Sequence, residues 1–423
     1  MTGDQTHRVR ALWLVGVLHA FTHLYHVALM PLYFLIQKDF ALSSLGEATL
    51  LVTAMMVSYF VPSYPMGMLA DRFSRKKLLG IGLLINALGF VGLALAPTYP
   101  LAVAAMVLAG FGGSFFHPAA TAMVARLYPV GTGRALGLAA MGASVGFLVG
   151  PAYTGWRAEF SGWRAPVLEL GLLGIAGAVV FWILADDDQS AHKPDHHRLT
   201  TRIFPRGALW GFFIAAGVCF SLRDFTGNSM GTIGSLFLQK AHGFSLPSTG
   251  LALSAIFVTS LISNPLFGVL SDRARSRWGV AVLIVAAVVV ALFPRLPKAM
   301  LVPGLMIYGF FFMANYPIVE AALMESVPDA VRGRVFGFFI TIGGLVGNLS
   351  HWIVGNWVQH LGFRGGSPAG YYGLYLILGG LILVSLLGWP CLHAIRKREQ
   401  LGASGAHPNP QSAGALAMPN PEL

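Results

Sequence analysis

Apolar stretches of about 20 residues recur along the whole chain and alternate with short polar segments. Wound as a helix, a stretch of that length crosses the hydrocarbon core of a bilayer, which is about 30 Å thick. The stretches start near Ala11, Ala48, Leu78, Leu101, Ala135, Val167, Ala208, Ser248, Val280, Leu301, Val335 and Tyr371. The pattern therefore predicts an all-α membrane protein with twelve transmembrane helices.

The chain also repeats itself at a distance of about 200 residues. A Gly-x-x-x-Asp-Arg segment ends at Arg72 and again at Arg273. Further echoes follow in the same order, and they pair His19 with Arg223, Pro118 with Pro317, and Gly133-Arg134 with Gly333-Arg334. A repeat of this length indicates a duplicated structural unit. We therefore expect two pseudo-symmetric halves of six helices each.

These patterns divide the chain into five segments. The N-terminal half spans 11–185 and the C-terminal half spans 207–395. Residues 1–10 form a polar, basic N-terminus, and 186–206 form a polar linker whose His192, Asp195, His196 and His197 are interpreted as solvated linker rather than a metal site. The tail, 396–423, is rich in Ala, Gly, Pro and Asn beyond Arg398 and is predicted to be disordered.

Charge adds the orientation. Only 11% of the residues are charged, whereas 55% are hydrophobic. With both termini inside, most of the 28 Lys and Arg fall in cytoplasmic segments, which is the positive-inside pattern. The net charge of +11 is thus explained by topology, and no nucleic-acid partner is predicted. We expect a monomer in the inner membrane that contacts lipid, protons and a small molecule. Cys219 and Cys391 lie in apolar segments, so no disulfide framework is indicated.

The repeated loop resembles a motif of the major facilitator superfamily. Residues 67–77 are similar to the G-x-L-a-D-r-x-G-r-k pattern of that family, with Ser74 at the second Gly and Arg275 at that place in the looser second copy. The resemblance covers about residues 10–395 and implies the major facilitator fold. It also implies a gating role for Gly67, Asp71, Arg72, Arg75, Gly268, Asp272 and Arg273. The glycines are expected to allow close helix approach. The alternative is that these charges only set topology.

A second glycine pattern falls in the fifth apolar stretch. Gly137, Gly146, Gly150, Pro151 and Gly155 resemble the G-x8-G-x3-G-P-x2-G-G motif of antiporters of the superfamily, with Thr154 at the penultimate Gly. The resemblance favours export over uptake. Ordinary packing of small residues between membrane helices is the alternative interpretation.

Three histidines mark the first helix. His19, His23 and His26 follow one another at spacings of four and three, which places them on one helical face. Because ionisable groups inside a membrane are costly, we expect this face to line a central cavity and bind substrate. Hydrogen bonding to neighbouring helices is the alternative. No Cys or clustered carboxylate accompanies the histidines, so no metal or other cofactor is predicted.

The seventh stretch carries Arg223 and Asp224. A permanently charged guanidinium suits an anionic group of a substrate, so Arg223 is a predicted binding residue. Adjacent helical residues diverge by about 100°, so Arg223 and Asp224 need not pair with each other. A structural ion pair of Arg223 with Glu169 or Glu320 is the alternative.

His117 and Asn315 each precede an echoed proline, Pro118 and Pro317. A polar group and a helix break are therefore expected together in each half, and both side chains are predicted to bind substrate.

The run Phe116-His117-Pro118-Ala119, with His19, Thr22 and Arg223, resembles the fosmidomycin-resistance subfamily of exporters. The resemblance implies expulsion of a small phosphonate antibiotic, or a similar anionic or zwitterionic compound, in exchange for protons. Many proton-coupled exporters of the superfamily carry an Arg where this chain has Met106. Proton coupling is therefore assigned to Asp224, with His23 and Glu320 as further candidates.

Two other functions stay open from the sequence. One is an uptake symporter of an organic anion or metabolite, and the other is a non-transporting membrane sensor or partner subunit. An enzyme is not predicted, because the chain carries neither a P-loop nor a convincing nucleophile–base set.

Overall fold

The computed structural model describes residues 3–128, 132–186, 204, 207–327 and 332–405. The predicted linker, apart from Asp186 and Phe204, and the last part of the predicted tail lie outside the described residues. Within the described part the chain is helical, and twelve helical segments are long and apolar enough to cross a membrane. The predicted all-α fold with twelve transmembrane helices is confirmed.

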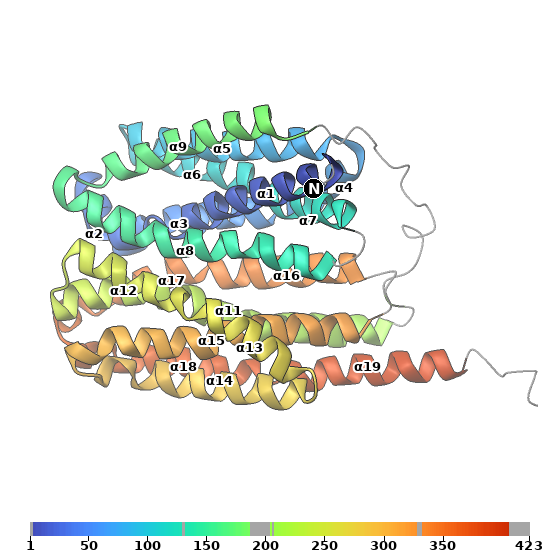
Figure 1. Ribbon diagram of the computed structural model, residues 1–423. Coiled ribbons are helices and arrows are strands. Elements are labelled where there is room, and N and C mark those ends of the chain that lie inside the picture. Colours follow the sequence, from blue (N-terminus) through green and yellow to red (C-terminus); the bar gives the residue numbers. More distant parts are fainter. Residues whose placement is uncertain (1–2, 129–131, 187–203, 205–206, 328–331, 406–423) are drawn as a thin grey trace, which may run out of the picture.

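The two halves lie side by side (Figure 1), the first coloured blue to green and the second yellow-green to red. The N-terminal half contains α1 (Gly3–Val27), η1 (Met30–Leu32), α2 (Tyr33–Asp39), α3 (Leu45–Phe60), α4 (Ser63–Arg72), α5 (Arg75–Leu95), α6 (Tyr99–Gly113), α7 (Phe116–Leu127), α8 (Thr132–Ser161) and α9 (Arg164–Leu184). The C-terminal half contains α11 (Gly207–His242), α12 (Leu246–Val258), α13 (Ser260–Ser271), α14 (Arg275–Leu292), η2 (Phe293–Arg295), η3 (Lys298–Met300), α15 (Leu301–Glu325), α16 (Arg332–Asn348), α17 (Ser350–His360), η5 (Gly362–Gly366), η6 (Pro368–Tyr371), α18 (Tyr372–Ser385) and α19 (Gly388–Gly405).

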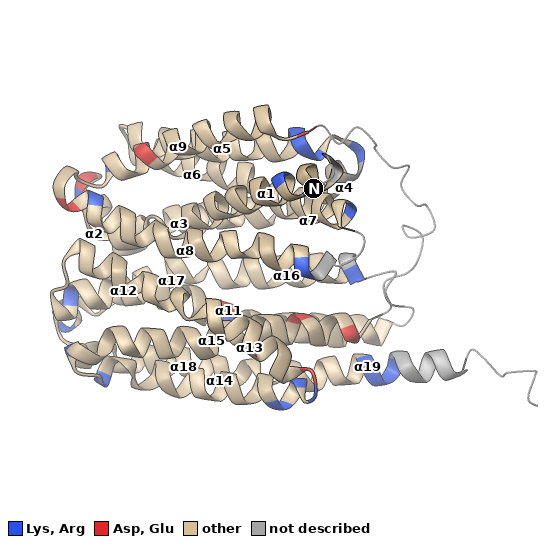
Figure 2. Cartoon of the chain, viewed as in Figure 1, with Lys and Arg blue, Asp and Glu red and all other residues tan. Residues whose placement is uncertain are grey.

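Charged residues gather at the two ends of the helices, and the faces between those ends carry few of them (Figure 2). We call the end that holds the start of α1 and the last turns of α19 the basic end. This distribution follows from solvation, because a charge at the level of the hydrocarbon core loses its water. The arrangement is that of a multi-pass membrane protein.

The echoed prolines behave differently in the two halves. The helix of the N-terminal half breaks after Gly113 and restarts as α7 at Phe116, just before Pro118. In the C-terminal half α15 continues through Pro317 without a break, so the expectation of two matched breaks is wrong. The difference follows from the preceding residues. Gly112 and Gly113, which precede Pro118 by six and five residues, weaken the first helix, whereas Phe311 and Phe312 occupy the corresponding positions before Pro317.

The halves meet along two helix pairs, α8 with α12 and α3 with α17. Ser254 of α12 donates a hydrogen bond of 2.6 Å to the carbonyl of Leu148 on α8. In the second pair, the Thr53 hydroxyl of α3 donates a bond of 3.0 Å to the carbonyl of Asn348, the last residue of α16, directly before α17. Both bonds use side-chain hydroxyls, which find no water partner at this depth and therefore favour contact between the halves.

Glycines on α8 bring three helices to backbone contact. A Cβ on Gly146 would overlap the carbonyl of Ala20 on α1, and a Cβ on Gly155 would overlap the carbonyl of Leu246 on α12. A Cβ on Gly150 would come within 2.9 Å of the Leu24 carbonyl oxygen. Gly137, by contrast, faces open space. Of the glycines expected from the antiporter-like motif, Gly146, Gly150 and Gly155 thus pack closely, and Gly137 does not.

Pro151 and Thr154 complete this surface of α8. The helix stays continuous through Pro151, whose carbonyl lies where a Cβ on Gly250 of α12 would be. The Thr154 hydroxyl lies 2.7 Å from the Ala28 carbonyl and 2.9 Å from that of Gly150. Thr154, which stands where the motif has a glycine, therefore has a hydrogen-bond acceptor for its hydroxyl in the turn that follows α1.

We expect Gly146→Val to destabilise the protein, because its side chain has no room between α1 and α8. Overpacking of this kind costs about 1–3 kcal/mol. The purified protein is heated in detergent to a series of temperatures, and size-exclusion chromatography then measures the fraction that stays folded. Gly137→Val is the matched control on the same helix, and it should melt close to the unsubstituted protein. Equal melting temperatures for both variants would contradict this account of the α1–α8 contact.

Candidate functional site

The histidines of α1 form one cluster with His117, the second residue of α7. The Nε2 atoms of His19 and His23 are 3.0 Å apart. The ring of His117 lies 5.3 Å from that of His19 and 5.7 Å from that of His23, centroid to centroid. His26 extends the cluster, 5.0 Å from His23. The helix break before Pro118 therefore brings a fourth imidazole to the face that the spacing on α1 predicts.

The cluster is enclosed by aromatic rings and one carbonyl. Tyr59 of α3 lies edge-on to His26 at 4.9 Å, and Phe147 of α8 lies 4.5 Å from His23. His19 Nδ1 lies 3.0 Å from the carbonyl oxygen of Ala139 on α8. His117 is exposed although it packs against the other rings, whereas the α1 histidines are half-buried. The cluster therefore opens at His117, and His19 also makes the interhelical hydrogen bond that the alternative interpretation expected.

The C-terminal half places a charged group at the equivalent position. Arg223 of α11 is 2% exposed. Its Nη1 donates a hydrogen bond of 2.6 Å to Asn315 Oδ1 on α15, and Asn315 Nδ2 donates one of 3.3 Å to the Gly279 carbonyl on α14. The guanidinium carbon also lies 4.4 Å from the ring centre of Tyr316. Two consecutive residues of α15 therefore hold the arginine, one through a hydrogen bond and the other through its aromatic ring.

Arg223 also pairs with its neighbour in sequence. Its Nε and Nη2 donate to the same oxygen of Asp224, at 3.0 and 2.7 Å. The sequence left this pairing open, and the structure shows it, because both side chains are long enough to turn back toward each other despite the helical divergence. Glu169, the alternative partner, lies instead with Arg157 at 2.8 Å and accepts a hydrogen bond from Tyr153.

Asp224 packs closely against two glycines of α16, Gly343 and Gly347. A Cβ on Gly343 would come within 2.7 Å of Asp224 Oδ2, and one on Gly347 within 2.9 Å of Asp224 Cβ. Glu320 follows Tyr316 by one turn of α15 and is half-buried. Sequence reasoning missed both the aromatic face of Tyr316 and these glycines. Tyr316 could have been found from the sequence, because it lies between Asn315 and Pro317. The contact of Gly343 with Asp224 could not, because it depends on how α16 packs in the fold.

The two clusters are pseudo-symmetric in position and different in chemistry. In each half the first and fourth transmembrane segments meet, through His19 and His117 in one and through Arg223 and Asn315 in the other. The N-terminal cluster consists of imidazoles and aromatic rings. The C-terminal cluster holds a permanent cation and two carboxylates. A molecule between the halves would therefore meet imidazole rings on one side and a salt-bridged pair on the other.

An ion-pair network occupies the second copy of the repeated loop, at the basic end. Arg275 Nε lies 2.6 Å from a carboxylate oxygen of Glu325 at the end of α15, and Arg275 Nη2 lies 3.1 Å from Asp272. Arg396 of α19 approaches Glu325 at 3.6 Å. Arg273, a predicted gating residue, is exposed. Glu325 thus links the end of α15 to α14 through Arg275 and to α19 through Arg396. Arg275 stands where the family pattern has a glycine, and nothing in the sequence indicated a role for Glu325.

The first copy of the loop is described only in part. Asp71 belongs to α4, but its side chain lies outside the described part of the structure. Arg72 is exposed, and Arg75 begins α5. The glycines do not bring helices together as expected. Gly268 faces open space, and Gly67 makes only an ordinary contact, 3.8 Å from a Pro118 carbon.

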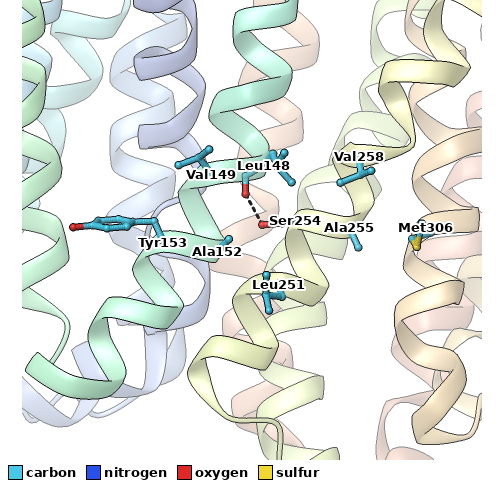
Figure 3. A pocket seen from close by; sticks show the side chains of 9 residues that line it. All are labelled: Leu148, Val149, Ala152, Tyr153, Leu251, Ser254, Ala255, Val258 and Met306. Carbon is cyan, nitrogen blue, oxygen red and sulfur yellow. Dashed lines mark hydrogen bonds between the residues drawn. The ribbon is translucent and has the colours of Figure 1, made fainter.

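An apolar groove of about 360 Å³ follows the contact between α8 and α12 (Figure 3). Leu148 and Val149 line it from α8, Leu251 and Val258 from α12, and Met306 from α15. The groove contains none of the ionisable residues of the two clusters. The groove is therefore part of the interface between the halves, and it is not the candidate functional site.

Comparison with known proteins agrees with this architecture. The sequence model of the family described as Major Facilitator Superfamily matches residues 12–351 of this chain. A multi-drug resistance efflux pump, PmrA, of Streptococcus pneumoniae is 29% identical over 313 residues, which cover 71% of this chain and 76% of that protein. Multidrug resistance protein 2 of Bacillus subtilis is 26% identical over 299 residues, with 68% and 73% covered. The quinolone resistance protein NorA of Staphylococcus aureus is 24% identical over 230 residues, with 54% and 58% covered.

Solved structures share the fold at low sequence identity. A bacterial homologue of the human lysosomal transporter Spinster superposes with a TM-score of 0.74 at 17% identity, covering 94% of this chain and 98% of that one. A D-xylose–proton symporter superposes with a TM-score of 0.71 at 18% identity, with 90% and 96% covered. Both likenesses concern the fold alone.

The buried ion pair gives a prediction on stability. Asp224→Asn removes the charge that balances a buried guanidinium, and breaking such a pair typically costs about 3–5 kcal/mol. The double variant Arg223→Met/Asp224→Asn removes both charges, so it should melt at a higher temperature than Asp224→Asn alone. Thermal unfolding of the single and double variants in detergent measures this order. A double variant that melts below both single variants would show that the pair is not coupled in this way.

Proposed function

The chain belongs to the Major Facilitator Superfamily, and we propose that it is a proton-coupled exporter of small zwitterionic organic molecules that works by alternating access. It lies in the inner membrane as a monomer, with both termini in the cytoplasm. Export is supported by the similarity to PmrA, a multi-drug resistance efflux pump, and by the glycine surface of α8, where the two halves meet in backbone contact.

The observation that carries the proposal is the buried pair of Arg223 and Asp224. A carboxylate inside the membrane is stable there only while a cation or a proton balances its charge. Arg223 already supplies one balancing charge, and it is held in place by Asn315 and the ring of Tyr316. Asp224 and the nearby Glu320 are therefore the groups whose protonation can respond to what lies beside them.

Exchange requires that substrate and proton compete for the carrier. A substrate ammonium group beside Asp224 or Glu320 binds the ionised carboxylate and excludes the proton, whereas the protonated carboxylate rejects the ammonium. Proton binding on one side of the membrane then releases the substrate there. A zwitterionic substrate fits this arrangement, because its anionic end remains free for the N-terminal half.

A purely anionic substrate would couple with the opposite sign. An anion that took the guanidinium from Asp224 would leave that carboxylate without its positive partner, and the carboxylate would then bind a proton. Anion and proton would move together, which describes the uptake symporter that the sequence left open. The pair of Arg223 and Asp224 thus favours the zwitterionic over the phosphonate-like substrate, and the sign of proton movement separates the two.

Proton movement in proteoliposomes tests the proposal. We would trap a pH-sensitive dye inside, set equal pH on both sides, and add norfloxacin as a zwitterionic quinolone, or fosmidomycin as an anionic phosphonate. Inflow of substrate through an antiporter drives protons out, so the lumen becomes more alkaline. We expect this response to norfloxacin. Acidification would identify a symporter, and a folded protein silent to both compounds would contradict the proposal.

Substitutions connect that response to the pair. We expect Asp224→Asn to abolish substrate-driven proton movement, because the carboxylate for which substrate and proton compete is lost. Melting curves of the variant in detergent show whether it is folded. Glu169→Gln is the matched control, because this carboxylate belongs to the separate pair with Arg157. Unchanged proton movement in Asp224→Asn would move the coupling group elsewhere.

A further inference from the structure

The imidazole cluster of the N-terminal half has no part in the exchange described above. Its rings come from two elements, α1 and α7, and the ligand nitrogens of His19, His23 and His117 all lie within 4.8 Å of one another. His19 and His23 are one helical turn apart and on the same face of α1. Three nitrogens so close together, without a carboxylate among them, need an explanation in a membrane interior.

The tautomer of His19 follows from its neighbour. The Ala139 carbonyl can only accept a hydrogen bond, so the ring nitrogen that faces it at 3.0 Å, Nδ1, carries the proton. In the neutral ring Nε2 is then unprotonated and directs a lone pair toward His23. A histidine that binds a metal ion has this arrangement, because its second nitrogen donates to a carbonyl that fixes the ring.

His23 supplies a second observation. Its Nδ1 is buried and has no hydrogen-bond partner among the described residues, although its Nε2 lies 3.0 Å from His19 Nε2. In the neutral ring one nitrogen carries the proton, and with that proton on Nδ1 the Nε2 lone pair faces His19 Nε2. The two facing Nε2 atoms, and not Nδ1, therefore define the point at which an ion would bind.

The distances suit a bound ion. Zn²⁺–N bonds of about 2.0–2.1 Å place the nitrogens of a tetrahedral site about 3.3 Å apart. The His19–His23 separation of 3.0 Å already has this size. His117 belongs to the first turn of α7 and is exposed, so it is the ligand with room to adjust and the side from which an ion enters.

We propose that His19, His23 and His117 form a binding site for one divalent transition-metal ion. Three neutral imidazoles suit Zn²⁺, Co²⁺, Ni²⁺ or Cu²⁺, whereas Mg²⁺ and Ca²⁺ require oxygen ligands. The three ligands leave a fourth position open on the exposed side. Neutral ligands do not cancel the ion's charge, so an anionic group, such as hydroxide or a substrate carboxylate, completes the site. The inference does not depend on the proposed proton exchange.

Cobalt binding to the full-length protein tests the site. Four-coordinate Co²⁺ has an intense visible absorption that six-coordinate Co²⁺ in water lacks. The protein would be purified with an affinity tag that contains no histidine, and His192, His196 and His197 of the linker would be changed to Ser so that they cannot bind the ion. We expect one Co²⁺ per chain with a four-coordinate spectrum, displaced by Zn²⁺.

Single variants locate the ligands. His19→Gln, His23→Gln and His117→Gln should each weaken Co²⁺ binding by at least the roughly 10–100-fold that loss of an outer hydrogen-bond partner causes. His360→Gln on α17 is the matched control and should bind normally. Melting curves without metal show whether each variant is folded, and only variants that retain the cluster should gain stability with Zn²⁺. Absence of four-coordinate Co²⁺, or binding that survives all three ligand substitutions, overturns the inference.

Discussion

The low-dielectric interior of the bilayer is the constraint on which the whole structure depends. Polar groups that lose water must find partners within the protein, and charges must be balanced there. Lys, Arg, Asp and Glu therefore gather at the helix ends (Figure 2), where Arg275, Glu325 and Asp272 form an ion-pair network. At depth the same constraint selects a pair, Arg223 with Asp224, and Asn315 accepts a further hydrogen bond from the guanidinium.

The duplicated halves meet this constraint in two ways. The N-terminal half keeps its central polar groups as imidazoles, which are uncharged in their neutral tautomers and so need only hydrogen-bond partners or an ion. The C-terminal half holds a permanent cation, so it must also hold a carboxylate. Pseudo-symmetry fixes where the groups lie, since the first and fourth segments meet in each half. The chemistry at each position is free to diverge, because each cluster is satisfied mainly within its own half.

Much of this arrangement could be predicted from the sequence, because its causes are local or periodic. The length of apolar runs gives the twelve spans, and the spacing of His19, His23 and His26 gives their common face. The contacts that could not be predicted depend on side-chain length or on segments distant in sequence. Arg223 reaches its own neighbour because both side chains bend back, and Gly343 packs against Asp224 because α16 packs against α11. Gly268 fits a family pattern yet faces open space, so a motif does not by itself establish a contact.

The close contacts of α8 determine which parts can move. Gly146 and Gly150 bind α8 to α1 within one half, whereas Gly155 and Gly250 form the contact with α12 across the halves. Backbone-to-backbone contact leaves no side chains to be reordered when two helices rotate, so a rocking motion about α8 and α12 loses little packing. The imidazole cluster moves with α1, and the ion pair moves with α11. In the alternating-access cycle that we propose, motion of the halves would change the distance between the two clusters without breaking either, and a molecule that contacts both would bind the two states differently.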